Sequence, residues 1–274
     1  MYNLMLKFPN FNDKCLTFSY DDGTIHDVRL AELFKKYNLK GTFNVNTELS
    51  ENEGRLSMSK LRELYEKTGM EVAVHGAKHV HVANYPSPTL MREFIIDKQN
   101  LELEFKTVIR GMAYAYGSYS DVALNILDTA GIKYGRTTNS TLNFDIPDNF
   151  LLWNPTCHHA NPKLFELLDE FFNKPVVKIG ITLPRLFYVW GHSYEFNNNN
   201  NWELIEEFCK KASGKTDVWY ATNIEIYDYV TAYRNLSFSV DLKYVYNPSA
   251  IDVYVLVEGN KVIAKAGMVT KIGE

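Results

Sequence analysis

The chain has 274 residues, of which 46% are hydrophobic and 23% are charged. The length allows one large α/β domain or two small ones. The hydrophobic and charged fractions are typical of a globular protein. The net charge of −4 and the pI near 6.0 give no basic surface, which argues against a nucleic-acid-binding protein. No apolar run reaches the roughly 18 residues that a membrane span needs.

Apolar runs alternate with amphipathic segments up to residue 235. The predicted strands are residues 15–20, 41–46, 70–74, 108–116, 132–137, 184–190 and 217–221. The predicted helices are residues 27–38, 58–68, 87–105, 121–130, 163–173 and 202–213, the second with Ser57 as its N-cap and Gly69 just past its end. A last helix opens at Thr222, which can form a capping box with Glu225. This alternation predicts a parallel sheet, open or closed into a barrel.

The pattern changes from Leu236 onward, where apolar and polar residues alternate. Turn signals occur at Asn247-Pro248 and Gly259-Asn260. We predict a small antiparallel β appendage of two or three strands over residues 236–274. It is too short to fold alone and should pack against the barrel formed by residues 1–235.

The cysteines and the N-terminal segment bear on the cellular setting. Cys15, Cys157 and Cys209 have no CxxC spacing, which argues against a disulfide framework and a cysteine zinc site. Residues 1–13 lack the charged start and apolar run of a signal peptide. For the chain as given, we therefore expect a cytoplasmic protein.

Two adjacent aspartates, Asp21 and Asp22, follow the first predicted strand. Like charges repel and a dry carboxylate is costly, so the pair is either a solvated turn or the partner of a cation. His75 and His79 follow another strand end, four residues apart, and can bring both imidazoles to one side. Two imidazoles and one carboxylate form a common metal-binding face with open positions. The second carboxylate could then act as a base on metal-bound water.

Three further clusters follow predicted strands, and each also fits ordinary packing. His192, next to Trp190 in sequence, would share a barrel rim with Asp21 and could be a general acid. Tyr114 and Tyr116 precede Gly117, and a turn there leaves a backbone N–H able to face a ligand. The segment LLWNPTCHHA, residues 151–160, supplies candidates for the wall of the cleft.

In chain order, the segments TFSYDDG, HGAKH, AYAYGSY and WGHSYEF resemble motifs of the polysaccharide deacetylase family, which is the NodB homology group or carbohydrate esterase family 4. The resemblance covers roughly residues 14–230. It implies a distorted (β/α) barrel, similar to a TIM barrel, with about seven parallel strands. It also implies a hydrolase that removes acetyl groups from N-acetylated or O-acetylated saccharides with one divalent metal ion. That ion is expected to be Zn²⁺, with Co²⁺, Ni²⁺, Mn²⁺ and Fe²⁺ as alternatives.

The resemblance also implies roles for individual residues. The expected metal ligands are Asp22, His75 and His79. The expected catalytic residues are Asp21 as general base, His192 as general acid and Tyr116 through its backbone N–H. The expected substrate-binding residues are Tyr114, Trp153, Trp190 and Arg110.

Three departures from the family pattern affect these expectations. Ala113 stands where the third motif usually has the arginine that orients the base, and the nearest arginine is Arg110. Gly76 replaces the usual Ser or Thr of the second motif, and no clear DxxW motif is present.

Three other functions remain open on the sequence. The first is an amidase for a small or cyclic non-sugar amide, and the second is a non-catalytic carbohydrate-binding relative. A non-haem iron oxygenase would share the two-histidine, one-carboxylate face, but no signal for its 2-oxoacid or pterin site is present. The expected partner is an acetylated saccharide, with no nucleic acid and no membrane span; the oligomeric state is not predicted.

Overall fold

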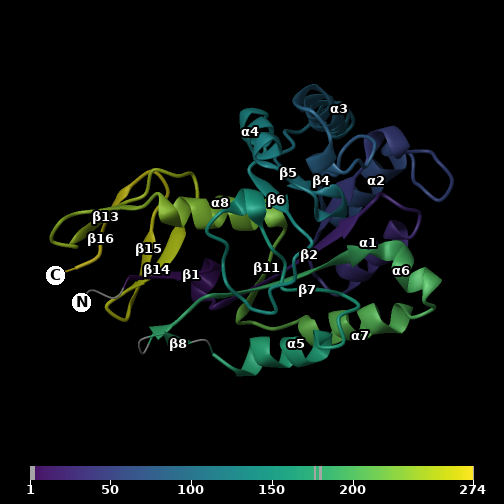
Figure 1. Ribbon diagram of the computed structural model, residues 1–274. Coiled ribbons are helices and arrows are strands. Elements are labelled where there is room, and N and C mark those ends of the chain that lie inside the picture. The colour runs from purple at the N-terminus through teal and green to yellow at the C-terminus, as the bar shows by residue number, and fades with distance from the viewer. Residues whose placement is uncertain (1–3, 176, 179–180, 274) are drawn as a thin grey trace.

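The computed structural model describes residues 4–175, 177–178 and 181–273, so residues 1–3 and 274 of the two predicted units lie outside the described residues. Its centre is a curled parallel sheet with the strand order β6-β5-β4-β3-β2-β10-β7 (Figure 1). The strands are β2 (Lys14–Asp21), β3 (Thr42–Val45), β4 (Glu71–Val74), β5 (Gly111–Ala113), β6 (Tyr134–Arg136), β7 (Cys157–His158) and β10 (Arg185–His192). A further strand, β11 (Val218–Tyr220), pairs with the start of β2. The predicted distorted (β/α) barrel is confirmed.

The sheet curls far enough for its two ends to approach one another. Arg136 at the end of β6 forms a parallel bridge with Trp153, and β7 follows Trp153 by four residues. β7 in turn pairs with β10. The segment from Trp153 to β7 therefore spans the gap between the two ends of the sheet.

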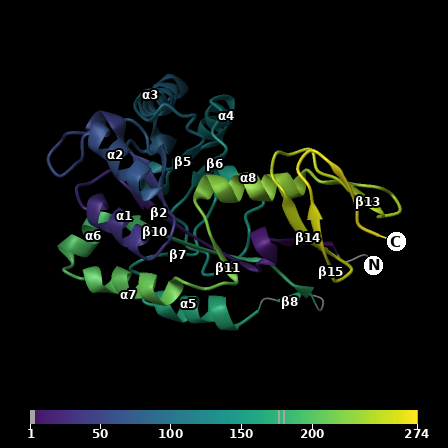
Figure 2. The same ribbon diagram turned by 180° about the vertical axis from the view of Figure 1, so that it is seen from behind.

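Helices cover the outer face of the sheet (Figures 1 and 2). They are α1 (Asp27–Lys36), α2 (Met58–Thr68), α3 (Ser87–Phe105), α4 (Asp121–Thr129), α5 (Leu164–Asn173), α6 (Ser193–Asn198) and α7 (Trp202–Ala212). Helix α8 (Asn223–Arg234) packs instead against a second core cluster that contains Cys15 and Trp153. Gly69 ends α2 in the left-handed conformation at φ 73°, which suits a residue without Cβ. The capping box of Thr222 and Glu225 begins α8, as the sequence predicted.

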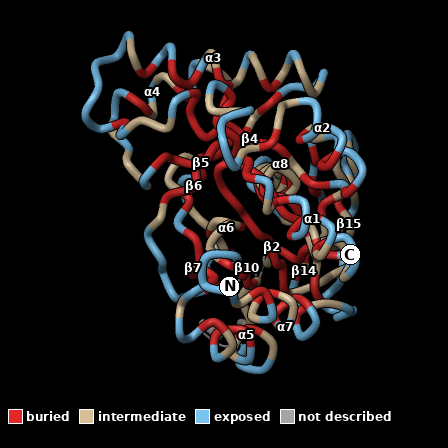
Figure 3. The backbone as a smooth tube through the Cα atoms, turned by 90° about the vertical axis from the view of Figure 1, so that its right-hand side faces the viewer, coloured by how far each residue is buried: buried red, intermediate tan, exposed pale blue. Residues whose placement is uncertain are grey.

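Strand β2 is buried on both faces, as a central parallel strand should be. Leu16 and Phe18 pack into the outer core with Phe34 of α1. Cys15 packs into a separate inner core with Trp153 and its neighbours. Figure 3 shows these strands as the buried centre, with exposed loops around them.

The C-terminal region forms two small sheets, β1-β14-β15 and β12-β13-β16. The strands are β1 (Leu4–Lys7), β12 (Ser237–Phe238), β13 (Tyr244–Tyr246), β14 (Val253–Val257), β15 (Asn260–Ala264) and β16 (Val269–Lys271). The expectation of two or three strands was wrong, because five strands follow residue 235 and β1 adds to them from the N-terminus. The boundary at residue 235 therefore stays a prediction.

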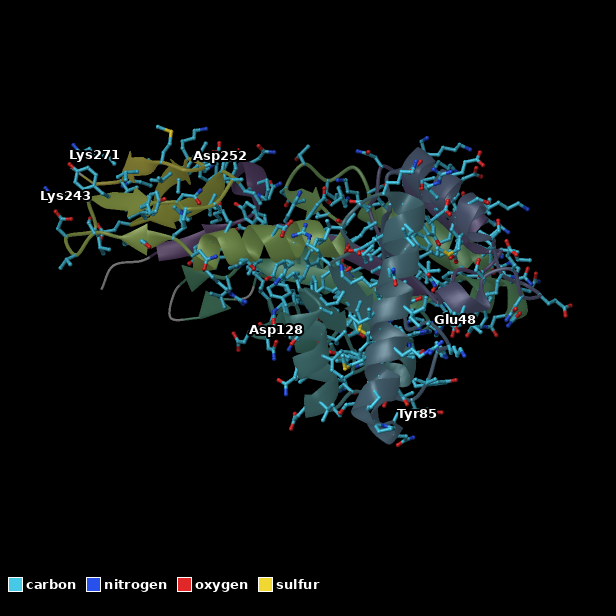
Figure 4. All side chains as sticks on the ribbon, turned by 90° about the horizontal axis from the view of Figure 1, so that it is seen from above. Glu48, Tyr85, Asp128, Lys243, Asp252 and Lys271 are labelled. Carbon is cyan, nitrogen blue, oxygen red and sulfur yellow. The ribbon has the colours of Figure 1, made fainter. Side chains whose placement is uncertain are left out.

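Seen from above in Figure 4, Lys243 and Lys271 lie at one end of the molecule, and Glu48 and Tyr85 lie at the other. A short antiparallel hairpin, β8 (Val177–Lys178) with β9 (Ile181–Thr182), precedes β10. In the part of the chain that the structure describes, no helix is long and apolar enough to cross a membrane.

Candidate metal and catalytic site

The carboxyl ends of β2, β4 and β10 bring the sequence-predicted residues together. Asp21 is the last residue of β2 and His192 the last residue of β10, and the two are opposite one another in the parallel register. His75 follows β4 directly. Because parallel strands end at the same edge of a sheet, residues separated by more than 100 positions share one site.

Asp22, His75 and His79 form a three-residue group whose ligand atoms all lie within 4.8 Å of one another. Oδ1 of Asp22 is 3.9 Å from Nε2 of His75 and 3.8 Å from Nε2 of His79. Nδ1 of His75 is 2.9 Å from the carbonyl oxygen of Ala113, to which only a protonated nitrogen can donate. Nε2 of His75 therefore keeps its lone pair, as a metal ligand requires.

The donor set also fits a divalent cation in its charge and in its unmet bonding. Oδ1 of Asp22 is buried and has no hydrogen-bond partner among the described residues. A buried carboxylate oxygen without a partner is costly, and a bound cation would remove that cost. Burial, and next the neighbouring His75, lower the pKa of His79 to about 4, so its imidazole is neutral at physiological pH. Two neutral imidazoles and one carboxylate suit Zn²⁺ and related ions.

Helix α3 and strand β3 support the loop that carries the two histidines. Asp97 accepts a hydrogen bond from the backbone N–H of His75 at 3.0 Å. Asn46 donates to the carbonyl oxygens of His75 and Gly76 at 2.9 and 2.8 Å. Gly76 has φ 85°, and a Cβ there would lie 2.9 Å from Oε1 of Glu93. This conformation and close approach explain why Gly76 stands where the family usually has Ser or Thr.

Asp21 is held by two donors. Its Oδ1 accepts from Nδ2 of Asn44 at 2.8 Å, and its Oδ2 accepts from Nη2 of Arg136. Burial raises the pKa of Asp21, but the guanidinium of Arg136, with His75 and His192, outweighs burial and lowers it to about 2. Asp21 is therefore ionised at neutral pH.

Arg136 makes the contact with Asp21 for which the sequence offered no arginine at position 113. It is fully buried, comes from β6, and places its guanidinium 4.5 Å from the centre of the Trp190 ring. The Trp190 ring therefore covers the guanidinium of Arg136, and this contact is its link to the site. The sequence reasoning missed Arg136, although an arginine at the end of a predicted strand was a usable signal, since Asp21 ends a strand in the same way.

His192 has one ring nitrogen held and the other turned to Asp21. Its Nδ1 is 3.1 Å from Oε1 of Glu195, and its Nε2 is 3.9 Å from Oδ2 of Asp21. Burial acts to lower the pKa of His192, but the hydrogen bond that it donates to Glu195 and the charges of Asp21 and Asp22 raise it above its usual value. These contacts favour a protonated imidazole, as a general acid requires.

Glu195 also lies against two more histidines, a grouping that the sequence reasoning did not recognise. Its Oε2 is 3.1 Å from Nε2 of His158 and 2.9 Å from Nε2 of His159. Nδ1 of His158 accepts the backbone N–H of Ala160 at 3.1 Å, so the hydrogen of a neutral ring sits on Nε2. That nitrogen then has no lone pair for a metal. The geometry indicates a carboxylate that accepts imidazole N–H groups, not a second metal site.

The three imidazoles favour the ionised form of the Glu195 carboxyl group. Burial acts to raise its pKa, but hydrogen bonds from His158, His159 and His192 hold it well below its usual range. A carboxylate that stays ionised fixes the orientation of His192 and supports its positive charge.

The structure does not bring all expected substrate contacts to this edge. Tyr114 is fully buried and its hydroxyl donates to the carbonyl of Leu151. Trp153 is 1% exposed and lies in the inner core. Both expectations of substrate contact disagree with these positions, because each side chain packs within a hydrophobic core cluster.

Arg110 lies at the other edge of the sheet, directly before β5. Its guanidinium forms a bidentate pair with Asp228 of α8, at 2.7 and 2.8 Å. The expectation that Arg110 binds substrate disagrees with this position, since active-site residues of such barrels gather at the carboxyl ends of the strands.

Tyr116 lies beside His79, at the edge of the candidate metal triad of Asp22, His75 and His79. Its backbone is left-handed at φ 57°, and its side chain is 57% exposed. The ring stacks on His81 at a centroid distance of 3.9 Å and lies 4.4 Å from the ring of His79. Tyr116 is thus beside the group that could hold a cation, where a backbone donor is useful.

Comparison with known proteins extends these observations. Residues 9–135 match the family described as polysaccharide deacetylase. The resemblance to the polysaccharide deacetylase family is therefore confirmed over these residues. The matched segment contains Asp21, Asp22, His75, His79 and Tyr116, whereas His192 lies beyond it. No curated protein matches the chain.

Solved structures of the deacetylase family resemble the chain in fold. A protein assigned as a polysaccharide deacetylase from Mycobacterium smegmatis matches with a TM-score of 0.62 and 16% identity, over 84% of this chain and 94% of that one. A pseudoenzyme of carbohydrate esterase family 4 from Bacillus anthracis matches with a TM-score of 0.52 and 15% identity, over 81% and 68%. A family likeness therefore does not by itself establish catalysis.

A deacetylase from Streptococcus pyogenes, solved in complex with acetate, is more similar in sequence over a shorter region. The identity is 25% and the TM-score 0.47 over 50% of this chain. The chain spans 61% of the length of that deacetylase.

Proposed function

We propose that the chain hydrolyses acetyl groups from N-acetylated or O-acetylated saccharides with one divalent cation, Zn²⁺ in the first instance, held by Asp22, His75 and His79. The observation that carries this proposal is the buried Oδ1 of Asp22, which makes no hydrogen bond among the described residues and faces two imidazole nitrogens beside an ionised Asp21. The match to the polysaccharide deacetylase family over residues 9–135 supports the reaction class.

The chemistry divides between the cation and the chain. A bound divalent cation polarises the acetyl carbonyl and makes a bound water more acidic. Asp21, fixed by Asn44 and Arg136, accepts the proton of the attacking water. The backbone N–H of Tyr116 would donate to the oxygen that gains negative charge, a contact worth about 10²–10³ in rate at other enzymes.

His192 completes the reaction by proton transfer to the leaving group. Its Nδ1 is engaged by Glu195, so Nε2 is the nitrogen that faces Asp21 and the reacting centre. A protonated Nε2 donates to the departing sugar nitrogen or oxygen, which is a poor leaving group without a proton.

The supporting contacts favour a hydrolase over a carbohydrate-binding relative. A binding site needs neither a carboxylate clamped by an arginine nor an imidazole clamped by a glutamate. Arg136 holds Asp21, and Glu195 holds His192. Both contacts orient groups for proton transfer, which is why we propose catalysis despite the pseudoenzyme among the structural neighbours.

The test is acetate release from a panel of N- and O-acetylated saccharides, with the chain stripped by chelator and then reloaded with Zn²⁺ or Co²⁺. The proposal requires release that the chelator abolishes and that metal restores. Acetate-free hydrolysis of a small cyclic amide would instead support an amidase. No turnover of any substrate, with metal bound at one ion per chain, would support a binding protein.

Removal of a metal ligand should abolish metal binding. Changes beside a metal ligand typically cost about 10–100-fold in affinity, so Asp22→Ala should cost at least about 100-fold. Metal per chain after equilibrium dialysis, measured by mass spectrometry, gives the result. His81→Ala is the matched control, since His81 lies in the same loop but outside the triad, and it should keep one ion per chain. Full metal content in Asp22→Ala would contradict the assignment.

Replacement of Glu195 should change the pH profile. His192 must be protonated, so activity is lost as pH rises through its pKa, which Glu195 raises. Glu195→Gln should therefore shift the alkaline limb of kcat/KM to lower pH. Glu203→Gln, an exposed change on α7, is the control and should leave the limb in place. An unchanged alkaline limb in Glu195→Gln would show that Glu195 does not support the acid.

A further inference from the structure

Arg55 lies beside the metal triad on a segment that is tied to the loop after β2. Thr24 and Arg55 form an isolated antiparallel bridge. The backbone N–H of Leu56 donates to the carbonyl of Gly23, and that of Ile25 donates to the carbonyl of Gly54, each at 3.0 Å. These bonds fix Arg55 next to Asp22, although nothing in the sequence motifs marks it.

The guanidinium of Arg55 is anchored by one nitrogen. Its Nη1 donates to the main-chain oxygen of Asp22 and to Oδ1 of Asn46, the latter at 3.3 Å. Among the described residues, Nε and Nη2 of Arg55 make no hydrogen bond, and neither is enclosed by protein. With 19% of the side chain exposed, these donors face the solvent beside the triad.

Apart from Asp22, the carboxylates around the triad are paired with residues other than Arg55. Asp21 is paired with Arg136, and Glu195 accepts from His192. Nη1 of Arg55 is 3.4 Å from Oδ1 of Asp22. Among the described residues, no other carboxylate lies within 4.0 Å of the Arg55 guanidinium. The same oxygen faces the two imidazoles that could hold a cation with it. Once a cation takes that oxygen, the guanidinium is an unneutralised charge at the edge of the site.

We propose that Arg55 binds a carboxylate on the substrate, so that the chain acts on acidic acetylated saccharides in preference to neutral ones. This rests on the proposed deacetylase function. A guanidinium offers parallel N–H donors that match a carboxylate, and it cannot lose its charge. The anchored Nη1 fixes the plane of the group, so less conformational freedom is lost when the anion binds.

Two matched tetrasaccharides test the preference. One is a tetramer of N-acetylglucosamine, and the other alternates N-acetylglucosamine with glucuronic acid. For the metal-loaded chain, kcat/KM should be about two- to fivefold higher for the acidic tetramer at low salt, the effect of roughly one partly exposed charge pair. The ratio should fall as salt screens the pair. In Arg55→Gln the ratio of the two kcat/KM values should fall by about the same factor.

A control separates this role from loss of any arginine nearby. Arg62 of α2 pairs with Glu104 at 3.0 Å, so Arg62→Gln removes the same charge from a neighbouring element. It should keep the acidic-to-neutral ratio of the unmodified chain. Since the ratio is taken within one variant, a general loss of activity or folding in Arg55→Gln cancels.

Calorimetry gives a second readout that does not need turnover. The acidic tetramer should bind the metal-loaded chain more tightly than the neutral one, and Arg55→Gln should remove the difference. Equal turnover and equal binding of both tetramers would overturn the inference while leaving the deacetylase proposal intact. Arg55-dependent binding without turnover of either tetramer would support the inference and overturn the deacetylase proposal.

Discussion

Asp21→Asn should lower kcat by about 10²–10⁴-fold, the usual contribution of a positioned general base. The amide cannot accept the proton of the attacking water, whereas Asp22, His75 and His79 are untouched. The variant should therefore keep about one metal ion per chain. Acetate release measured beside metal content separates the two effects, because loss of both would indicate damage to the triad.

The buried charge of Arg136 complicates this variant and suggests a second one. Asp21→Asn leaves a fully buried guanidinium without its carboxylate, which typically costs about 3–5 kcal/mol of stability. The double variant Asp21→Asn/Arg136→Gln removes both charges and should recover part of that loss, with kcat still low. Near-normal turnover in either folded variant would show that Asp21 is not the base.

The metal triad was predictable from the sequence because its residues come from local patterns. Asp22 follows a buried run, and His75 and His79 are four residues apart behind another. Strand order did not need to be known, since every parallel strand delivers its last residues to the same edge. The parallel sheet followed from the alternation of strand and helix patterns, which local spacing encodes, whereas its closure into a distorted barrel was implied by the family resemblance.

The partners of the catalytic residues were not predictable in the same way. Arg136 meets Asp21 only because the sheet curls enough for a side chain at the end of β6 to reach the end of β2. The two residues are 115 positions apart in the chain. Glu195 was hidden for a different reason. It lies three residues after His192 in a helix that begins at Ser193, and the sequence reasoning gave that segment no helix.

The misplaced substrate contacts follow from the direction of side chains along short strands. Strand β5 has three residues, so a few positions separate its two ends. Arg110 precedes it and faces α8, whereas Tyr114 follows it and turns inward to Leu151. A spacing of three or four residues in sequence cannot distinguish these ends. The appendage was underestimated because five short strands follow residue 235 in the described part of the chain, and β1 joins one of their sheets from more than 240 positions away.

Arg136→Gln compared with Arg110→Gln should decide which arginine serves the base. Arg136 is fully buried against Asp21, so its loss should cost about 3–5 kcal/mol of stability and reduce kcat/KM by at least about tenfold. Arg110 and Asp228 are partly exposed, with side chains 35% and 30% accessible, so Arg110→Gln should cost less than about 1 kcal/mol and leave turnover unchanged. Chemical denaturation and acetate release measure both quantities.

The pH dependence gives the sharper distinction between a structural arginine and one that tunes the base. Arg136 lowers the pKa of Asp21 from 3.8 to about 2, so the stability from this pair is present above pH 3.8 and is lost as pH falls through about 2. Without the guanidinium, burial dominates and the pKa of Asp21 rises. The base then becomes protonated at higher pH, and the acidic limb of kcat/KM should move upward in Arg136→Gln at constant metal content. An acidic limb that moves in Arg110→Gln instead would return the role to the arginine nearest the third motif.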